Sequence, residues 1–160
     1  MSSKINETVH TVVGGLALAN TAGIAGDIVS LENHHRCRVL VALAPASGTD
    51  TAAITLKQSQ DAAGTGIKAL AFTVAHRAAY ATSDVPAEIA VTANSITTSA
   101  TAVAELFSID VAASDLDTAN GFTWLSCNLS DPGSVSTPAV ILYQMYEARY
   151  SGPIFATAIA

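Results

Sequence analysis

The sequence predicts an all-β protein, an antiparallel β-sandwich or jelly roll with extended N- and C-terminal arms. Roughly eight short runs alternate apolar and polar residues with the period of a β-strand. Clusters rich in Gly, Pro and Asp separate these runs, as turns do. The runs do not alternate with helical patterns, which disfavours a parallel α/β sheet and leaves a sandwich.

A chain of 160 residues is expected to form one domain with a sizeable core. We divide it into an N-terminal arm over 1–26, a β-sandwich domain over 27–151 and a C-terminal arm over 152–160. The first arm is rich in glycine and has no charged side chain between Glu7 and Asp27, and the last arm has none at all. Exposed apolar ends cost solubility, so we expect both arms to dock on a partner or pair with an edge strand.

The first half of the domain is expected to hold a three-stranded meander. Residues 27–31 fit a short strand, and the first long strand is 37–44. Strands over 52–58 and 67–74 follow, each after a turn-rich gap. Because consecutive strands joined by short turns pair antiparallel, these three strands are predicted to be neighbours in one sheet. Residues 76–81 fit a helical turn.

The second half begins with a weak strand rich in Ala and Thr over 88–98, followed by a stronger one over 106–111. An acidic turn or single helical turn is expected over 112–121, and a strand with alternating faces over 122–129. Residues 138–150 are apolar on both faces, which predicts a central strand. Helical spacing of the same apolar residues leaves a helix as the alternative there.

The charge and cysteine content exclude several classes of protein. With 13 acidic and 7 basic residues the net charge is −6, which disfavours binding to nucleic acid. No uncharged apolar run approaches the roughly 18–20 residues that span a bilayer, so no membrane span is expected. Cys37 and Cys127 lack metal or redox spacing and are predicted to be small buried hydrophobic residues, with a disulfide only in an oxidising compartment. Arg36 and Arg38 lie on one face of a predicted strand, and we expect them to form salt bridges or to contact a partner there.

Three stretches contain the residue types of ligand sites, but their spacing is unsuitable. Residues 64–69 match G-x-G-x-x-A, yet that fingerprint needs a βαβ unit, so we interpret them as a hairpin turn. Residues 115–121 lack the EF-hand register; a solvated turn is favoured, with another type of calcium site as the alternative. His34 and His35, near Cys37, point to opposite faces of a strand and form no zinc-chelating pair. We therefore predict no catalytic, metal or cofactor-binding residue.

Three segments resemble a family of small structural proteins of tailed bacteriophages and prophages. They are ITLKQSQDAAGTGIKALAF at 54–72, LFSIDVAASDLDTANGFTWLSCNLSD at 106–131 and AVILYQMYEARYSGP at 139–153. The resemblance implies a non-enzymatic virion component, a capsid decoration or cement protein on the outer surface of the head that is assembled in the bacterial host cytoplasm. It further implies the major capsid protein as a partner and a homo-oligomer, a trimer, as the assembled form. The stretch 82–104 and the N-terminal arm depart from the resemblance.

In this interpretation the uncharged ends bind the shell or a neighbouring copy. The candidate partner-binding residues are Val12, Val13, Leu16, Leu18, Ile24, Arg36, Arg38, Ile154, Phe155 and Ile159. Neither a nucleic acid nor a membrane is expected as a partner. A tail or head–tail connector protein is one alternative. Another is a host- or carbohydrate-binding module that uses Trp124, Tyr143, Tyr146 and Tyr150.

Overall fold

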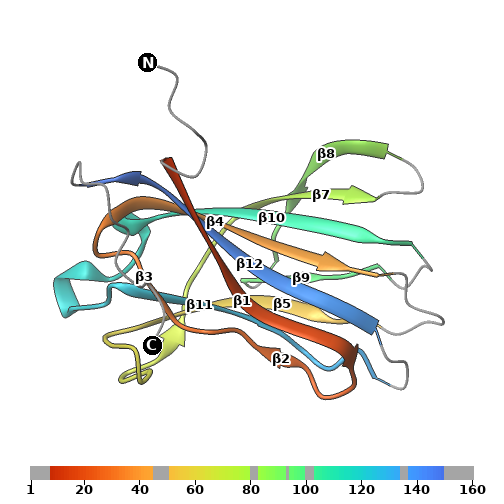
Figure 1. The fold of residues 1–160 in the computed structure, drawn as a ribbon, viewed down its shortest axis with the longest axis horizontal. Helices are drawn as coiled ribbons and strands as arrows, with labels where there is room; N and C mark the ends of the chain where they lie inside the picture. The colour runs from red at the N-terminus through yellow and green to blue at the C-terminus, as the bar shows by residue number, and fades with distance from the viewer. Residues whose placement is uncertain are drawn as a thin grey trace.

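The computed structural model describes residues 8–44, 51–79, 83–92, 94–99, 103–133 and 137–149. Within these ranges the chain forms antiparallel β-strands and two single 3₁₀ turns, η1 (Ala113–Asp115) and η2 (Thr118–Asn120) (Figure 1). The predicted all-β antiparallel fold is therefore confirmed. In the part of the chain that the structure describes, no helix has the length and hydrophobicity to cross a membrane.

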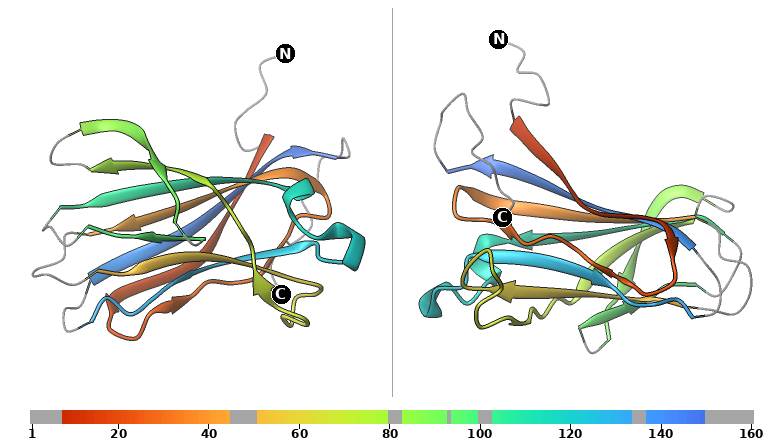
Figure 2. Two further views of the ribbon diagram at one scale, coloured as in Figure 1. Left: turned by 180° about the vertical axis from the view of Figure 1, so that it is seen from behind. Right: turned by 60° about the horizontal axis from the view of Figure 1, so that its bottom comes forward.

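The strands form two sheets that lie as stacked layers (Figure 2). Sheet A has the order β1-β12-β4-β10-β7-β8. Its strands are β1 (Val9–Asn20), β12 (Thr137–Ala148), β4 (His34–Leu43), β10 (Glu105–Ala112), β7 (Val74–Ala79) and β8 (Ser83–Ala90). Sheet B has the order β2-β11-β5-β6, and β3 and β9 pair with β11 and β5. Its strands are β2 (Ile24–Ala25), β11 (Trp124–Leu129), β5 (Ala53–Ser59), β6 (Lys68–Ala69), β3 (Val29–Ser30) and β9 (Ser95–Thr97).

The core lies between the two sheets and is filled by alternate residues of the long strands. Fully buried side chains come from both layers: Val39, Val41, Phe107, Ile109, Ile141 and Tyr143 from sheet A, and Ile54, Leu56, Leu125 and Cys127 from sheet B. Cys37 and Cys127 are both free thiols inside this core, which confirms their prediction as buried hydrophobic residues. Burial raises the pKa of Cys127 to about 12 and raises that of Cys37 further still.

β12 is a central strand, as predicted, because it pairs with β1 on one side and with β4 on the other. Ile141 and Met145 face the core, whereas the alternate residues Leu142 and Tyr146 are half-buried on the outer face of sheet A. The helical alternative for this stretch is thereby excluded.

The predicted meander is wrong. β4 lies in sheet A between β12 and β10, whereas β5 lies in sheet B beside β11. Only β5 and β6 keep the expected hairpin pairing, over two residue pairs. Alternation of apolar and polar residues does not reveal which sheet a strand joins, because a strand can bury the same apolar side chains in the core from either sheet. The helical turn expected over 76–81 is also wrong, since β7 pairs with β10 and β8.

Most of the expected N-terminal arm is integrated into the sandwich. β1 pairs with β12 from Val9 to Asn20, and β2 joins sheet B through β11. Glycine permits this close packing, because a Cβ atom on Gly14 would lie 2.1 Å from Cε2 of Tyr143. Residues 1–7 and the expected C-terminal arm lie outside the described residues.

Candidate interaction surface

The outer face of sheet A carries a continuous apolar surface. The strand register aligns Val13 with Leu142 and Leu142 with Leu40. A second row aligns Leu16 of β1 with residues of β12, β4 and β10 in turn. We call the whole set the apolar face: Val13, Leu16 and Leu18 of β1, Val140 and Leu142 of β12, Leu40 and Ala42 of β4, and Leu106 of β10.

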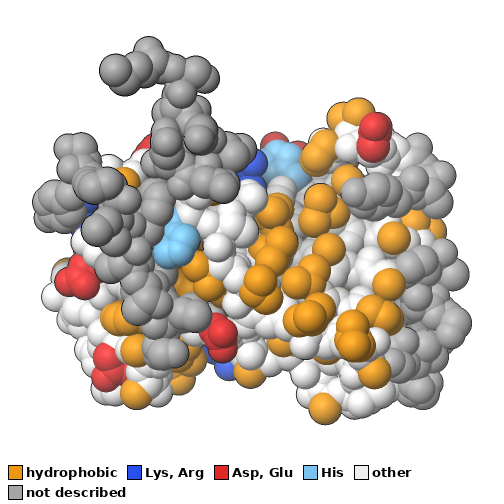
Figure 3. All heavy atoms as spheres, viewed as in Figure 1, with side chains coloured by type: hydrophobic (Ala, Val, Ile, Leu, Met, Phe, Trp, Pro, Cys, Tyr) orange, Lys and Arg blue, Asp and Glu red, His pale blue; other side chains and the backbone are white. Residues whose placement is uncertain are grey.

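The residues of the apolar face on β1 are the most exposed. Val13, Leu16 and Leu18 are 56%, 67% and 80% exposed, whereas Leu40 and Leu142 are half-buried among their neighbours. Figure 3 shows hydrophobic side chains gathered over this part of sheet A. Scattered exposed apolar residues are normal, but a contiguous group on four adjacent strands is typical of a surface that another molecule covers.

At the other end of the same face the side chains are polar and paired. Nε and Nη2 of Arg38 donate to the two carboxylate oxygens of Asp110 at 2.9 and 3.2 Å, and the Tyr146 hydroxyl donates to Oδ1 of Asp110 at 3.1 Å. Nε of Arg36 lies 3.4 Å from Oε2 of Glu147. Burial opposes ionisation of Asp110, but its hydrogen bond to Arg38 and the charge of that arginine outweigh this effect and lower its pKa. Exposed pairs of this kind stabilise a fold by about 1 kcal/mol or less.

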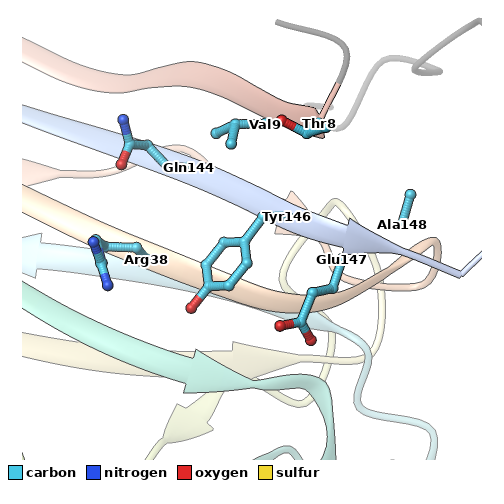
Figure 4. Close-up of a pocket in the computed structure, with 7 residues that line it drawn as sticks. All are labelled: Thr8, Val9, Arg38, Gln144, Tyr146, Glu147 and Ala148. Atoms are coloured by element: carbon cyan, nitrogen blue, oxygen red, sulfur yellow. The ribbon is translucent and has the colours of Figure 1, made fainter. Parts of the chain in front are cut away.

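A shallow groove of about 590 Å³ crosses this polar end. Tyr146 lies in its middle, between Arg38 and Glu147 (Figure 4). Its lining residues are Thr8, Val9, Arg38, Gln144, Tyr146, Glu147 and Ala148. Both charged residues of the lining have partners of opposite charge on the protein, and the groove continues the outer face of sheet A.

The predicted partner-binding residues separate into three groups. Val13, Leu16, Leu18, Arg36 and Arg38 lie together on the outer face of sheet A. The structure places two others, Val12 and Ile24, in the core, each with 9% exposure. The remaining three, Ile154, Phe155 and Ile159, lie outside the described residues.

Sequence reasoning missed the part of this surface that lies on the central strands, namely Leu40, Leu106, Val140 and Leu142. The signal was present, because β4 and β12 both have apolar residues at successive positions and therefore on both faces. Two such strands predict either a second covering layer or an exposed apolar surface. Their adjacency in sheet A, which the sequence does not reveal, joins the outer apolar residues of the two strands into one surface.

The other stretches with ligand-like residue types have structural roles. Gly64 and Gly66 adopt positive φ in the turn between β5 and β6, as expected for a hairpin. Both carboxylate oxygens of Asp117 accept hydrogen bonds from the Asn120 amide, and Oδ2 also accepts one from Nζ of Lys68 at 2.5 Å. This carboxylate is therefore neutralised by a protein cation. No group of three or more metal-ligating side chains occurs among the residues that the structure describes.

The aromatic residues considered for carbohydrate binding do not share a surface. Trp124 is half-buried on the outer side of sheet B, Tyr143 is fully buried in the core, and Tyr146 lies on the outer face of sheet A. The fourth, Tyr150, lies outside the described residues. A sugar-stacking platform built from these three described residues is thus not formed.

No protein-family model matches this chain, and no curated protein matches it in sequence. Among solved structures, the chain is similar to the SPBc2 prophage-derived protein YomS, with a TM-score of 0.44 and 12% sequence identity. The alignment covers 86% of this chain and 91% of YomS.

Proposed function

We propose that this protein is a non-enzymatic structural protein of a bacteriophage particle, specifically a capsid decoration protein that binds the outside of the head. The apolar face of sheet A is the observation that carries the proposal. It presents exposed Val13, Leu16 and Leu18 on a rigid sheet, where another subunit of the assembly, whether a second copy of this chain or another protein of the particle, would remove them from water. Such a face is suited to assembly by contact between surfaces, which requires no catalysis.

Charge and the state of the acidic side chains support the same role. A net charge of −6 suits the outside of a DNA-filled shell better than its inside. Several of the described carboxylates have partners within the protein, among them Asp110 with Arg38, Asp117 with Lys68, and Asp61 with the backbone and hydroxyl of Thr65. The specific assignment to the head rests on the three segments that resemble phage structural proteins, which also suggest the major capsid protein as the partner.

The proposal is tested on purified phage particles that encode this chain. Quantitative mass spectrometry should find it in the particle, in hundreds of copies that scale with the major capsid protein, and electron microscopy should locate it on the outer surface of the head. A ring-sized number of about six or twelve copies would instead favour the tail or head–tail connector. If the protein is expressed during infection but is absent from washed particles, the proposed function is wrong.

A further inference from the structure

We propose that a second copy of this chain covers the apolar face, in a face-to-face dimer with its twofold axis parallel to the strands and between β12 and β4. The inference rests on the proposed function only in taking this face to be an assembly surface. A twofold axis makes an interface self-complementary, so each residue must face a compatible residue of the same surface. The strand register determines which residues those are.

Close to the axis the contacts are apolar. The rotation places β12 over β4 of the second copy, so that Leu142 faces Leu40 and Val140 faces Ala42. Two sheets packed in this way lie about 10 Å apart, with their side chains interdigitated. The half-exposed side chains of both central strands would then fill a second core layer outside sheet A.

One strand further out the match continues. β1 lies over β10 of the second copy, and the register places Leu16 opposite Leu106 and Val13 opposite Ser108. This contact covers Leu16 and Val13, the two exposed β1 residues that are aligned with residues of β12, β4 and β10. The neighbouring strand β7 contributes a small, buried side chain, Ala78, in the row of Leu106.

The charges are compatible with this pairing. Arg36 and Arg38 would lie over Tyr146 and Gln144 of the second copy, neither of which is charged near neutral pH. Each arginine keeps its partner within its own subunit, since the bonds to Glu147 and Asp110 run between adjacent strands of one sheet. Like charges would not face each other near the axis, and Tyr146 offers an aromatic ring to a guanidinium group.

The outer face of the four strands is large enough for a reversible dimer. Four strands spaced about 4.8 Å apart give the outer face a width of about 19 Å, and ten residues of strand, which include the polar end with Arg36 and Arg38, give a length of about 33 Å. The product is roughly 600 Å² per copy, or about 1,200 Å² in total, which is at the lower limit of specific interfaces. We therefore expect a reversible dimer with a measurable dissociation constant.

Sedimentation equilibrium of the full chain tests the pairing. We expect a monomer–dimer equilibrium and, for Leu16→Lys, a dissociation constant at least about tenfold higher, since each dimer would bury two lysines against Leu106. The matched control is Val85→Lys on β8, because Val85 is 68% exposed, close to the 67% of Leu16, but lies outside the four-strand face. The control should leave the dissociation constant unchanged. Val13→Lys serves as a second test variant, and circular dichroism verifies that all variants fold.

A monomer at all concentrations, a trimer, or equal effects of Leu16→Lys and Val85→Lys would overturn the pairing. A monomeric full chain, together with a chain truncated after Arg149 that dimerises, would mean that the chain's own C-terminal segment covers the apolar face. The proposed pairing of two copies would then be wrong as well. Failure of this inference is distinguishable from failure of the proposed function. A monomer that still occurs in particles overturns only the pairing, and a dimer that is absent from particles overturns only the virion role.

Discussion

The hydroxyl group of Tyr143 connects the two sheets inside the core, and we predict that its removal destabilises the whole fold. The side chain comes from β12 of sheet A, accepts a hydrogen bond from the Cys127 N–H of β11 at 2.8 Å, and donates one to the carbonyl oxygen of Asp27 at 2.9 Å. Tyr143→Phe retains the ring that fills the core but leaves both backbone groups without this partner.

The expected loss follows from how well water can replace the hydroxyl. A buried donor or acceptor left unpaired costs about 1–3 kcal/mol. The Cys127 N–H is buried and bears this cost in full, whereas the Asp27 carbonyl is partly exposed and regains some hydration. We therefore expect Tyr143→Phe to lower the free energy of unfolding by about 2–4 kcal/mol.

Equilibrium unfolding in urea measures this change. Tyr146→Phe is the matched control, because the hydrogen bond it removes, of 3.1 Å to Asp110, is exposed, and its loss should cost about 0.5–1 kcal/mol. Equal destabilisation by the two substitutions, or a loss below about 1 kcal/mol for Tyr143→Phe, would refute the role of the buried hydroxyl as a link between the sheets.

Three further predictions concern the interior. Gly14→Ala should lower the free energy of unfolding by about 3 kcal/mol or more, because its Cβ would lie 2.1 Å from a buried tyrosine ring; a variant as stable as the wild type in urea would contradict this packing. Burial, and then the charge of a neighbouring histidine, lower the pKa of His34 below 6.5, so the unfolded chain takes up this proton at a higher pH than the folded chain. Stability should thus be insensitive to this group above about pH 6.5 and fall below it; His34→Gln should flatten that dependence in urea titrations, whereas the exposed control His35→Gln should not. The thiols of Cys37 and Cys127 should resist a thiol-specific reagent in the native protein and react once it is unfolded in guanidinium, and rapid native labelling would show that they are not buried as described.

Alternation of apolar and polar residues was sufficient to predict the fold class and several of its strands. β10 and β11 fall where the pattern predicts them, and the acidic stretch between them forms η1 and η2. β12 was predicted to be central because both of its faces are apolar, and this is confirmed. Each of these inferences depends on a residue and its near neighbours in sequence, which is the information that periodicity contains.

The pairing of the strands was less accessible. The sequence placed the strands now labelled β4 and β5 side by side, but the chain passes from one sheet to the other between them. Turn composition shows where a strand ends and gives no information on which layer the next strand joins. β1 was interpreted as part of an arm because this stretch is rich in glycine and lacks charged side chains. In the structure, Gly14 and Gly15 leave room for Tyr143 and Ile24, which come from other parts of the chain.

The candidate surface was half predictable for the same reason. The exposed residues of β1, with Arg36 and Arg38, could be selected from local composition. Leu40 and Leu142 could not, because their membership of one surface depends on β4 and β12 being neighbours across about a hundred residues of sequence. A long-range pairing of this kind becomes visible only in the folded chain.

The pairing of β1 with β12 also determines when this protein can fold. Val9 pairs with Tyr146, and β12 separates β1 from the rest of sheet A. During synthesis, β1 and one edge of β4 therefore remain without a partner until β12 has left the ribosome. Folding is expected to be late and slow, as for other proteins dominated by contacts between distant residues. In that interval the apolar side chains of β1 are exposed and can aggregate with other nascent chains. The cell must protect them, or synthesis must be fast enough for β12 to pair with β1 before another chain does.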